Sequence, residues 1–244
     1  LPLKFAEAGT RPDLTDAYTA FKQQRSGLPD GAAIEVCGDG WAMPLLAQRG
    51  ISHLKDRHKD ERIFVLGNGP SLGDVSAEIL RGATTIGSNG VHLMFDRWGF
   101  PVTYWMCEDR LQIEQELSRH RAALGDASVP VLPFDYAASV DWPAACFYPL
   151  SQSDGTRFPD GVSYPDFAPF GRAFRHGYTV TTSAIHLAVF MGVSEIVLLG
   201  VDHNYEIDGQ RDTVWTSQDA SKPTHFDHAY TDGKAFIRPR PLRA

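Results

Sequence analysis

Several groups of residues in this 244-residue chain have types and spacing that suit chemistry, and the clearest is a glycine turn. The turn, Gly67-Asn68-Gly69-Pro70-Ser71-Leu72, follows the apolar run Ile63-Phe64-Val65-Leu66 and precedes a segment with helical spacing. A glycine turn between a strand and a helix presents backbone N–H groups to phosphate, and we expect that role here. Leu72 stands where the third glycine of a dinucleotide fingerprint would be, and the turn lacks the longer spacer and Gly-Lys-Ser/Thr of a Walker loop, which disfavours P-loop ATP chemistry.

Polar side chains also follow the next two predicted strands. Asn89 ends the second strand, and Glu108 and Asp109 end the third. The carboxyl ends of parallel strands meet at one edge of a sheet, so we expect these residues to face the same crevice as Asn68. The two carboxylates have two open interpretations: a helix N-cap with a first-turn acid, or a pair of ligands for the Mg²⁺ of a nucleotide.

Two further clusters lie later in the chain. A predicted helix begins with four hydroxyl side chains, Thr179, Thr181, Thr182 and Ser183. These side chains either bind an anion or act as ordinary helix caps. The last cluster combines Asp202-His203-Asn204-Tyr205 with Thr224-His225-Phe226-Asp227-His228-Ala229-Tyr230. Histidine suits a general base, and a tyrosine hydroxyl can hydrogen-bond a departing phosphate. The spacing of the histidines and aspartates matches no standard zinc signature, so we expect no metal site.

Strand and helix patterns alternate around these residues. The strands are expected at Ile63–Leu66, Thr84–Asn89, Val102–Cys107, Val129–Pro133 and Glu195–Val201, and the helices at Asp74–Leu80, Val91–Trp98, Glu108–Leu124 and Thr179–Met191. This alternation predicts an α/β fold, a Rossmann-like mostly parallel sheet with helices on both faces. Val129–Pro133 is expected at a sheet edge, where proline is tolerated, and Glu195–Val201 as a strand buried on both faces.

Composition and charge narrow the function classes. The formal net charge of -7, from 23 basic and 30 acidic side chains, leaves no broad positive field for a nucleic acid, so none is expected as a partner. No apolar stretch approaches the roughly 20 residues of a membrane span, and residues 1–7 lack the pattern of a secretion signal. Three scattered cysteines, Cys37, Cys107 and Cys146, fit buried side chains in a reducing compartment. We therefore expect a cytoplasmic protein.

The order of these motifs resembles bacterial sialyltransferases that use CMP-sugars, and the related motility accessory factors, which are flagellin nonulosonate transferases. The resemblance rests on Val65–Leu72, Ser88-Asn89, the Thr/Ser-headed helix and Glu195–Asp202. It implies a modified glycosyltransferase-A fold and metal-independent, inverting transfer of a keto-acid sugar. We expect residues 61–244 to form the nucleotide-sugar-binding catalytic domain, after an N-terminal helical segment at 1–60 that the residue pattern predicts. The aperiodic stretch 151–177 would be a lid-like insertion.

The resemblance carries roles onto individual residues of this chain. It implies donor contacts by the turn and by the polar strand and helix ends, namely Gly67, Asn68, Gly69, Ser71, Asn89, Glu108, Asp109, Thr182, Ser183 and Asp202. Tyr205 corresponds to a tyrosine that hydrogen-bonds the CMP phosphate. His225 is the preferred general base, because related sequences keep a His-Phe pair there, and His228 is the other candidate. A second phosphate-binding tyrosine of the family has no match.

The expected donor is a CMP-activated sialic acid, other nonulosonate or Kdo, with no further cofactor. The expected acceptor is a glycan, a lipid-linked glycan or flagellin. The basic C-terminal end, with Lys234, Arg238, Arg240 and Arg243, is compatible with a peripheral contact to the inner membrane. Two alternatives stay open. The turn also resembles archaeal 6-hydroxymethylpterin diphosphokinases, which would need ATP and Mg²⁺, and the chain could be a non-catalytic sugar-nucleotide-binding module.

Overall fold

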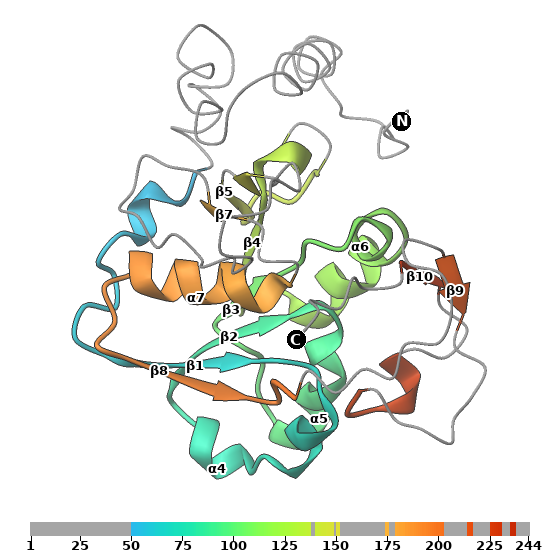
Figure 1. Ribbon diagram of the computed structural model, residues 1–244, viewed down its shortest axis with the longest axis horizontal. Helices are drawn as coiled ribbons and strands as arrows, with labels where there is room; N and C mark the ends of the chain where they lie inside the picture. Colours follow the sequence, from blue (N-terminus) through green and yellow to red (C-terminus); the bar gives the residue numbers. More distant parts are fainter. Residues whose placement is uncertain are drawn as a thin grey trace, which may run out of the picture. The chain divides into compact units, whose positions relative to one another are not determined.

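The structure, a computed structural model, describes residues 50–137, 140–148, 150–151, 174–175, 179–202, 214–216, 225–230 and 235–237. Its centre is a six-stranded sheet in the order β5-β4-β3-β2-β1-β8, accompanied by helices (Figure 1). The strands are β1 (Arg62–Leu66), β2 (Thr84–Ser88), β3 (Tyr104–Met106), β4 (Val129–Pro133), β5 (Cys146–Tyr148) and β8 (Glu195–Leu199). The pairings β1–β2, β1–β8, β2–β3 and β4–β5 are all parallel, which confirms the predicted α/β, Rossmann-like sheet.

The helices around the sheet are mostly short. They are α4 (Ala77–Leu80), α5 (Phe95–Trp98), α6 (Arg110–Leu124) and α7 (Val180–Phe190). Single 3₁₀ turns are η1 (Ile51–Leu54), η2 (Pro70–Asp74), η3 (Asn89–Met94), η4 (Phe134–Tyr136) and η5 (His228–Tyr230). Two small sheets pair β6 (Leu150–Ser151) with β7 (Phe174–Arg175) and β9 (Val214–Thr216) with β10 (Ala235–Ile237). Among the described helices, none is both long and apolar enough to cross a membrane.

Contacts divide the chain into two compact units, which are described separately. One unit comprises Leu1–Asp60 and Val129–Val193, and the other comprises Glu61–Ser128 and Ser194–Ala244. The second unit contains β1, β2, β3 and β8, with the glycine turn and residues 225–230. The predicted insertion at 151–177, apart from Ser151 and Phe174–Arg175, lies outside the described residues, and so do residues 1–49 of the expected N-terminal helical segment.

The apolar runs seen in the sequence form the core of the second unit. Ile63, Val65 and Leu66 of β1 are each at most 1% exposed, and all of β3 is buried. A strand that is apolar at every position can be buried on both faces, as central strands of parallel sheets are. The core therefore fixes β1 and β3, and the polar residues that follow each strand are held at the carboxyl edge of the sheet.

Four sequence expectations about elements are wrong in detail. β8 is an outer strand of the sheet, and Leu198 is 45% exposed, so β8 is not buried on both faces. β4 lies between β3 and β5 rather than at an edge. The prediction was wrong because it did not include the three-residue strand β5. The helices expected over Asp74–Leu80 and Val91–Trp98 are each a 3₁₀ turn followed by a short α-helix, η2 with α4 and η3 with α5. Ser76 caps α4 through its hydroxyl. The glycine turn is therefore followed by a 3₁₀ turn, which lacks the dipole of a long helix.

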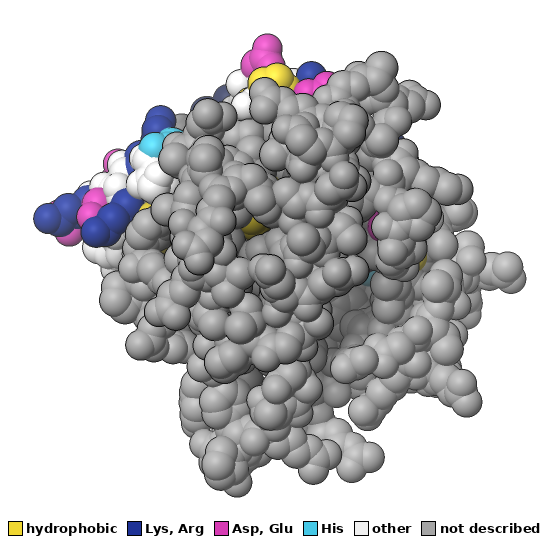
Figure 2. Space-filling model, turned by 90° about the horizontal axis from the view of Figure 1, so that it is seen from above, with side chains coloured by type: hydrophobic (Ala, Val, Ile, Leu, Met, Phe, Trp, Pro, Cys, Tyr) yellow, Lys and Arg dark blue, Asp and Glu magenta, His cyan; other side chains and the backbone are white. Residues whose placement is uncertain are grey.

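Residues 55–60, a mixed-charge run between η1 and β1, form a tight connection. Backbone N–H groups of Asp56, His58 and Asp60 donate to carbonyls at the end of α7 and after it, at 3.2, 3.0 and 3.1 Å. Asp56 and Asp60 adopt positive φ angles of 54° and 65°, which aspartate tolerates better than most residues. On the face shown in Figure 2, described basic and acidic side chains are intermixed. Lys55, Asp56, Arg57, Lys59 and Asp60 are exposed, so the charges of this run are solvated.

Candidate active site at the carboxyl edge of the sheet

The order of strands creates a topological switch point between β1 and β8. β1 pairs with β2 on one side and with β8, which comes more than a hundred residues later, on the other. Ligands of open α/β sheets bind outside the carboxyl ends of the strands at such a point. The glycine turn follows β1 and Gly200-Val201-Asp202 follows β8, so both segments lie where a ligand is expected.

The two segments are locked together by their backbones. Gly67 N–H donates to Leu199 O and Gly69 N–H donates to Gly200 O, both at 2.8 Å. A Cβ atom at position 67 would overlap the Gly200 carbonyl, and one at position 69 would overlap the Asp202 carboxylate. Glycine at 67 and 69 is therefore required by the packing of the protein on itself, whatever the ligand.

Asp202 completes this lock with its side chain. Its carboxylate accepts hydrogen bonds from the Ser71 N–H at 2.8 Å and from the Ser71 hydroxyl at 2.5 Å. The N–H groups of residues 67, 69 and 71 are thus engaged within the protein. A phosphate could use them only if these bonds broke, so the structure does not support the expectation that these N–H groups form a ready phosphate cradle.

Two asparagine side chains, in contrast, present buried acceptors. Asn68 Nδ2 donates to Ser88 O at 3.0 Å and to Ser88 Oγ at 3.1 Å, and because a carbonyl only accepts, the amide orientation is fixed. The Asn68 Oδ1 atom is then buried and has no hydrogen-bond partner among the described residues, and the same holds for Asn89 Oδ1. A buried acceptor without a donor costs about 1–3 kcal/mol, which a ligand hydroxyl or amine would recover.

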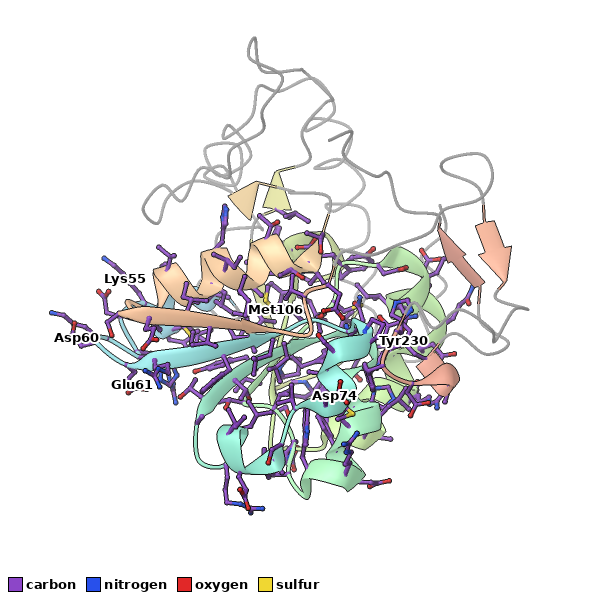
Figure 3. The ribbon with its side chains drawn as sticks, turned by 60° about the horizontal axis from the view of Figure 1, so that its bottom comes forward. Lys55, Asp60, Glu61, Asp74, Met106 and Tyr230 are labelled. Carbon is purple, nitrogen blue, oxygen red and sulfur yellow. The ribbon has the colours of Figure 1, made fainter. Side chains whose placement is uncertain are left out.

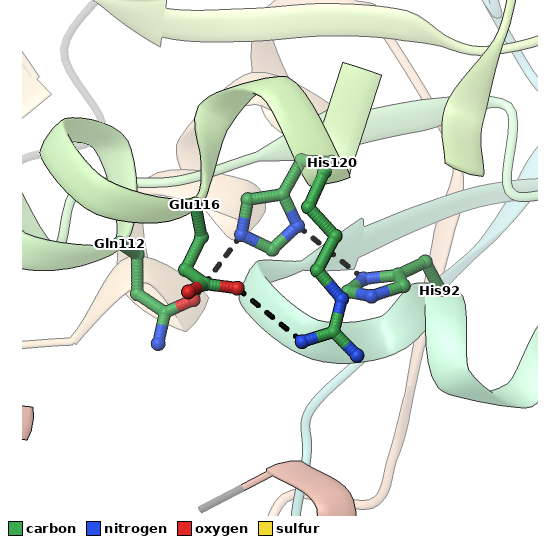
Figure 4. A network of polar contacts seen from close by, with 5 residues as sticks. His92, Gln112, Glu116 and His120 are labelled. Atoms are coloured by element: carbon green, nitrogen blue, oxygen red, sulfur yellow. Dashed lines mark hydrogen bonds and ion pairs between the residues drawn. The ribbon is translucent and has the colours of Figure 1, made fainter. Parts of the chain in front are cut away.

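Asn89 is held in an unusual backbone conformation by a buried tryptophan. Its φ angle is 47°, and its carbonyl accepts a hydrogen bond of 2.9 Å from Trp105 Nε1. Trp105 is fully buried and packs against the His120 ring, with ring centroids 4.9 Å apart. His120 is fixed in turn by His92, with 3.3 Å between their Nδ1 atoms, and by Gln112 Oε1 at 3.2 Å (Figure 4). This network makes Trp105 a rigid support for Asn89.

Residues 225–230 lie against the same turn. Phe226 N–H donates to Asn68 O at 3.2 Å, and Tyr230 packs over Gly90, where a Cβ would come within 2.5 Å of the tyrosine ring. Tyr230 lies beyond the carboxyl end of β1, whereas Glu61 lies before its amino end (Figure 3). The segment therefore belongs to the same edge of the sheet as the asparagines.

The His225 ring is stacked on Tyr230. The ring centroids are 4.0 Å apart and the planes differ by 13°. Burial lowers the pKa of His225 from 6.5 to about 4, so the imidazole is neutral at pH 7. A neutral imidazole has one ring nitrogen able to accept a proton, as a general base requires.

Other predicted site residues have mixed outcomes. Asp109 is the N-cap of α6 and accepts from Leu111 N–H at 2.8 Å and Gln112 N–H at 3.2 Å, which agrees with the capping interpretation. Glu108 is half-buried before it. Thr182 and Ser183 lie in the first turn of α7, in the unit that lacks the glycine turn, and Thr179 caps that helix. Tyr205 lies outside the described residues, and for His228 only the backbone is described.

Sequence reasoning gave no supporting role to Ser88, Gly90, Trp105 or Tyr230, although Ser88 and Tyr230 lie within motifs that it singled out. Gly90 directly follows Asn89, and a glycine after a polar strand end is a signal of close packing that was available. Trp105 carries no local signal, and the packing of Tyr230 on Gly90 could not be predicted locally, because both roles depend on contacts across the sheet edge.

Comparison of the sequence with protein-family models found no match, and comparison with curated proteins found none either. Within the described part of the chain, no group of three or more His, Cys, Asp or Glu side chains is arranged to hold a metal ion.

Proposed function

We propose that this chain is an inverting glycosyltransferase that moves a keto-acid sugar from a CMP-activated donor to a hydroxyl of a glycan or protein. The observation that carries the proposal is the meeting of two segments at the switch point: Phe226 N–H binds Asn68 O at 3.2 Å. This contact sets a neutral histidine, His225, beside the turn that resembles the donor-binding turn of CMP-sugar transferases. A base and donor-binding groups are needed in one site for this chemistry.

The buried asparagine oxygens favour a ligand rich in hydrogen-bond donors. Asn68 Oδ1 and Asn89 Oδ1 can only accept, so they suit the hydroxyls of a ribose or a sugar and the amine of cytosine. An ionised phosphate has acceptors alone and does not match them. In the proposal, these two residues therefore bind the ribose or sugar part of the donor.

The reaction needs a base and stabilisation of the leaving group. His225 takes the proton of the acceptor hydroxyl while the acceptor oxygen bonds to the anomeric carbon and the bond from that carbon to the phosphate breaks. With a pKa of about 4 in the free protein, His225 is a weak base. The phosphate and carboxylate of a bound donor are negative, and such charges raise the pKa of a nearby imidazole toward the working pH.

Stabilisation of the departing CMP phosphate falls to side-chain hydroxyls in this proposal. The turn N–H groups at 67, 69 and 71 are already bonded within the protein. Of the residues that the family resemblance offers for this role, Tyr205 lies outside the described residues, and Thr182 and Ser183 belong to the unit that lacks the glycine turn.

The test is a thermal-shift and calorimetric titration with CMP, CDP, UDP, GDP and ATP, each with Mg²⁺ and with EDTA. A true donor site stabilises the fold by mass action, so CMP should raise the melting temperature selectively and in EDTA as well. Transfer from CMP-sialic acid, CMP-Kdo and other CMP-nonulosonates to a glycan acceptor is then measured. His225→Ala should keep CMP binding and abolish transfer, and His58→Ala, in the other unit, should change neither.

Other outcomes would replace the proposal. Binding of ATP that depends on Mg²⁺ would favour a pyrophosphokinase. The absence of binding to any of these nucleotides would favour a non-catalytic module.

A further inference from the structure

A second pair of reactive side chains lies in the other unit, between Cys146 and His53. Cys146 begins β5 and His53 belongs to η1, which lies beside β5 because Gly50 forms a parallel bridge with Phe147. The Cys146 Sγ atom is 3.6 Å from His53 Nε2. On the opposite side of the ring, His53 Nδ1 is 3.1 Å from Gly50 O.

The Gly50 carbonyl determines which ring nitrogen of His53 carries the proton. A carbonyl oxygen only accepts, so Nδ1 donates to it, and in the neutral ring Nε2 holds the lone pair. That lone pair is on the nitrogen beside Cys146, so the thiol can donate to it. The arrangement has the three parts of an activated nucleophile: a thiol, a base within reach and a third group that orients the base.

We infer that Cys146 and His53 form a nucleophilic thiol–imidazole pair, a site of covalent modification by low-molecular-weight disulfides. The Sγ proton passes to His53 Nε2 and the thiolate attacks one sulfur of the disulfide. A new bond forms between the two sulfurs as the original disulfide bond breaks, and the released thiolate takes the proton from His53. The pair lies in a different unit from the proposed glycosyltransferase site and does not depend on it.

Cys107 provides a contrast within the same protein. Both thiols are buried, Cys107 at 0% and Cys146 at 6% exposure, but the Cys146 partner His53 lies at the surface. Burial, and then the negative charge of Asp109, raises the pKa of the Cys107 thiol well above its ordinary value. A thiol reacts as its thiolate, so Cys107 should be inert at neutral pH and serves as an internal control.

The experiment uses the full native chain at pH 7 with two probes, iodoacetamide and glutathione disulfide, and site-resolved peptide mass spectrometry. Cys146 should be alkylated at least about tenfold faster than Cys107, since one unit of thiol pKa is tenfold in thiolate. With glutathione disulfide, the Cys146 peptide should gain one glutathione and the Cys107 peptide none. Equal alkylation rates at Cys146 and Cys107, or no adduct on Cys146, would overturn the inference.

The role of His53 is tested with His53→Asn. The asparagine amide can still donate to Gly50 O, so the fold is kept, but it offers no base to the thiol. Alkylation of Cys146 should slow about tenfold while the rate at Cys107 and the melting temperature stay unchanged. His58→Asn is the matched control from the same segment and should leave Cys146 as reactive as in the parent protein. An unchanged Cys146 rate in His53→Asn would show that the histidine does not activate the thiol.

Discussion

Asp202 accepts two hydrogen bonds from Ser71, one from the N–H at 2.8 Å and one from the hydroxyl at 2.5 Å, across 131 residues of sequence. The pair joins the segment after β8 to the glycine turn after β1. It therefore decides the shape of the sheet edge at the switch point, where the proposed donor site lies.

The substitution Asp202→Ala should loosen this edge. It removes both acceptors, and because the pair is exposed, water replaces part of the loss, so we expect a destabilisation of about 1 kcal/mol. Binding of CMP should weaken as well. The control Asp74→Ala removes an exposed acid at the end of η2 and should change the free energy of unfolding by less than about 0.5 kcal/mol. Urea denaturation of the two variants checks this, and equal stability of both would show that the Asp202 contact is unimportant.

Gly69→Ala should be far more harmful than Gly73→Ala. A Cβ at 69 would overlap the Asp202 carboxylate, whereas a Cβ at 73 would meet nothing closer than Phe226 O at 3.8 Å. We expect a loss of about 2 kcal/mol for Gly69→Ala, as for other overpacked sites, and none for Gly73→Ala. The two melting temperatures measure the difference. Similar values would mean that the Asp202 side chain moves aside at little cost.

Stability should fall with acid because His225 is buried in its neutral form. Its pKa is 6.5 in the unfolded chain and about 4 in the folded one. Between these values the unfolded state binds more protons, so the contribution is complete above pH 6.5 and is lost as the pH falls toward 4. We expect this loss to be about 2 kcal/mol, with allowance for partial exposure.

The variant His225→Gln isolates this contribution. Glutamine does not titrate, so the difference in unfolding free energy between pH 7 and pH 4.5 should be smaller in the variant than in the parent. The measurement is chemical denaturation at both pH values. The same difference in both proteins would mean that folding does not shift the pKa of His225.

Trp105→Phe should weaken ligand binding specifically. It removes the N–H that holds the Asn89 carbonyl at 2.9 Å while keeping an aromatic ring. Trp98→Phe is a matched control, because Trp98 is also buried and its Nε1 donates to Val75 O at 3.4 Å. Both variants should lose about 1 kcal/mol of stability, and only Trp105→Phe should lower CMP affinity, by about fivefold. Calorimetric titration checks this, and an equal loss of affinity in both would remove the special role of Trp105.

Much of the sheet could be predicted because most of its strands coincide with apolar runs in the sequence. β4 matches its prediction at both ends, β1 and β2 differ from theirs by one residue each, and α6 begins directly after a capping aspartate. Apolar runs and helix caps are local signals, and burial of the apolar side chains in the core stabilises the elements that they predict. β5 was missed because three residues are too few to show a pattern. The burial of β8 was overestimated because an apolar run has the same sequence pattern in an outer strand as in a central one.

The site was harder to predict than the fold. The strand ends pointed to Asn68 and Asn89, and their buried oxygens agree with a binding role that remains a prediction. The glycine turn, however, suggested open N–H groups, and these are engaged by Leu199, Gly200 and Asp202. Pairings over such separations depend on the order of strands, which no local pattern reports.

The contact between Gly67 and Gly200 has a consequence for how this sequence can drift. A Cβ at 67 would strike the Gly200 backbone, and a Cβ at 200 would come within 2.8 Å of Leu72 Cβ and 2.9 Å of Gly67 O, at a φ of 67°. In each case part of the obstacle is main chain, which no change of a neighbouring side chain can shrink. Lineages that descend from this protein should thus keep both glycines without compensating pairs, even where the ligand they serve has changed.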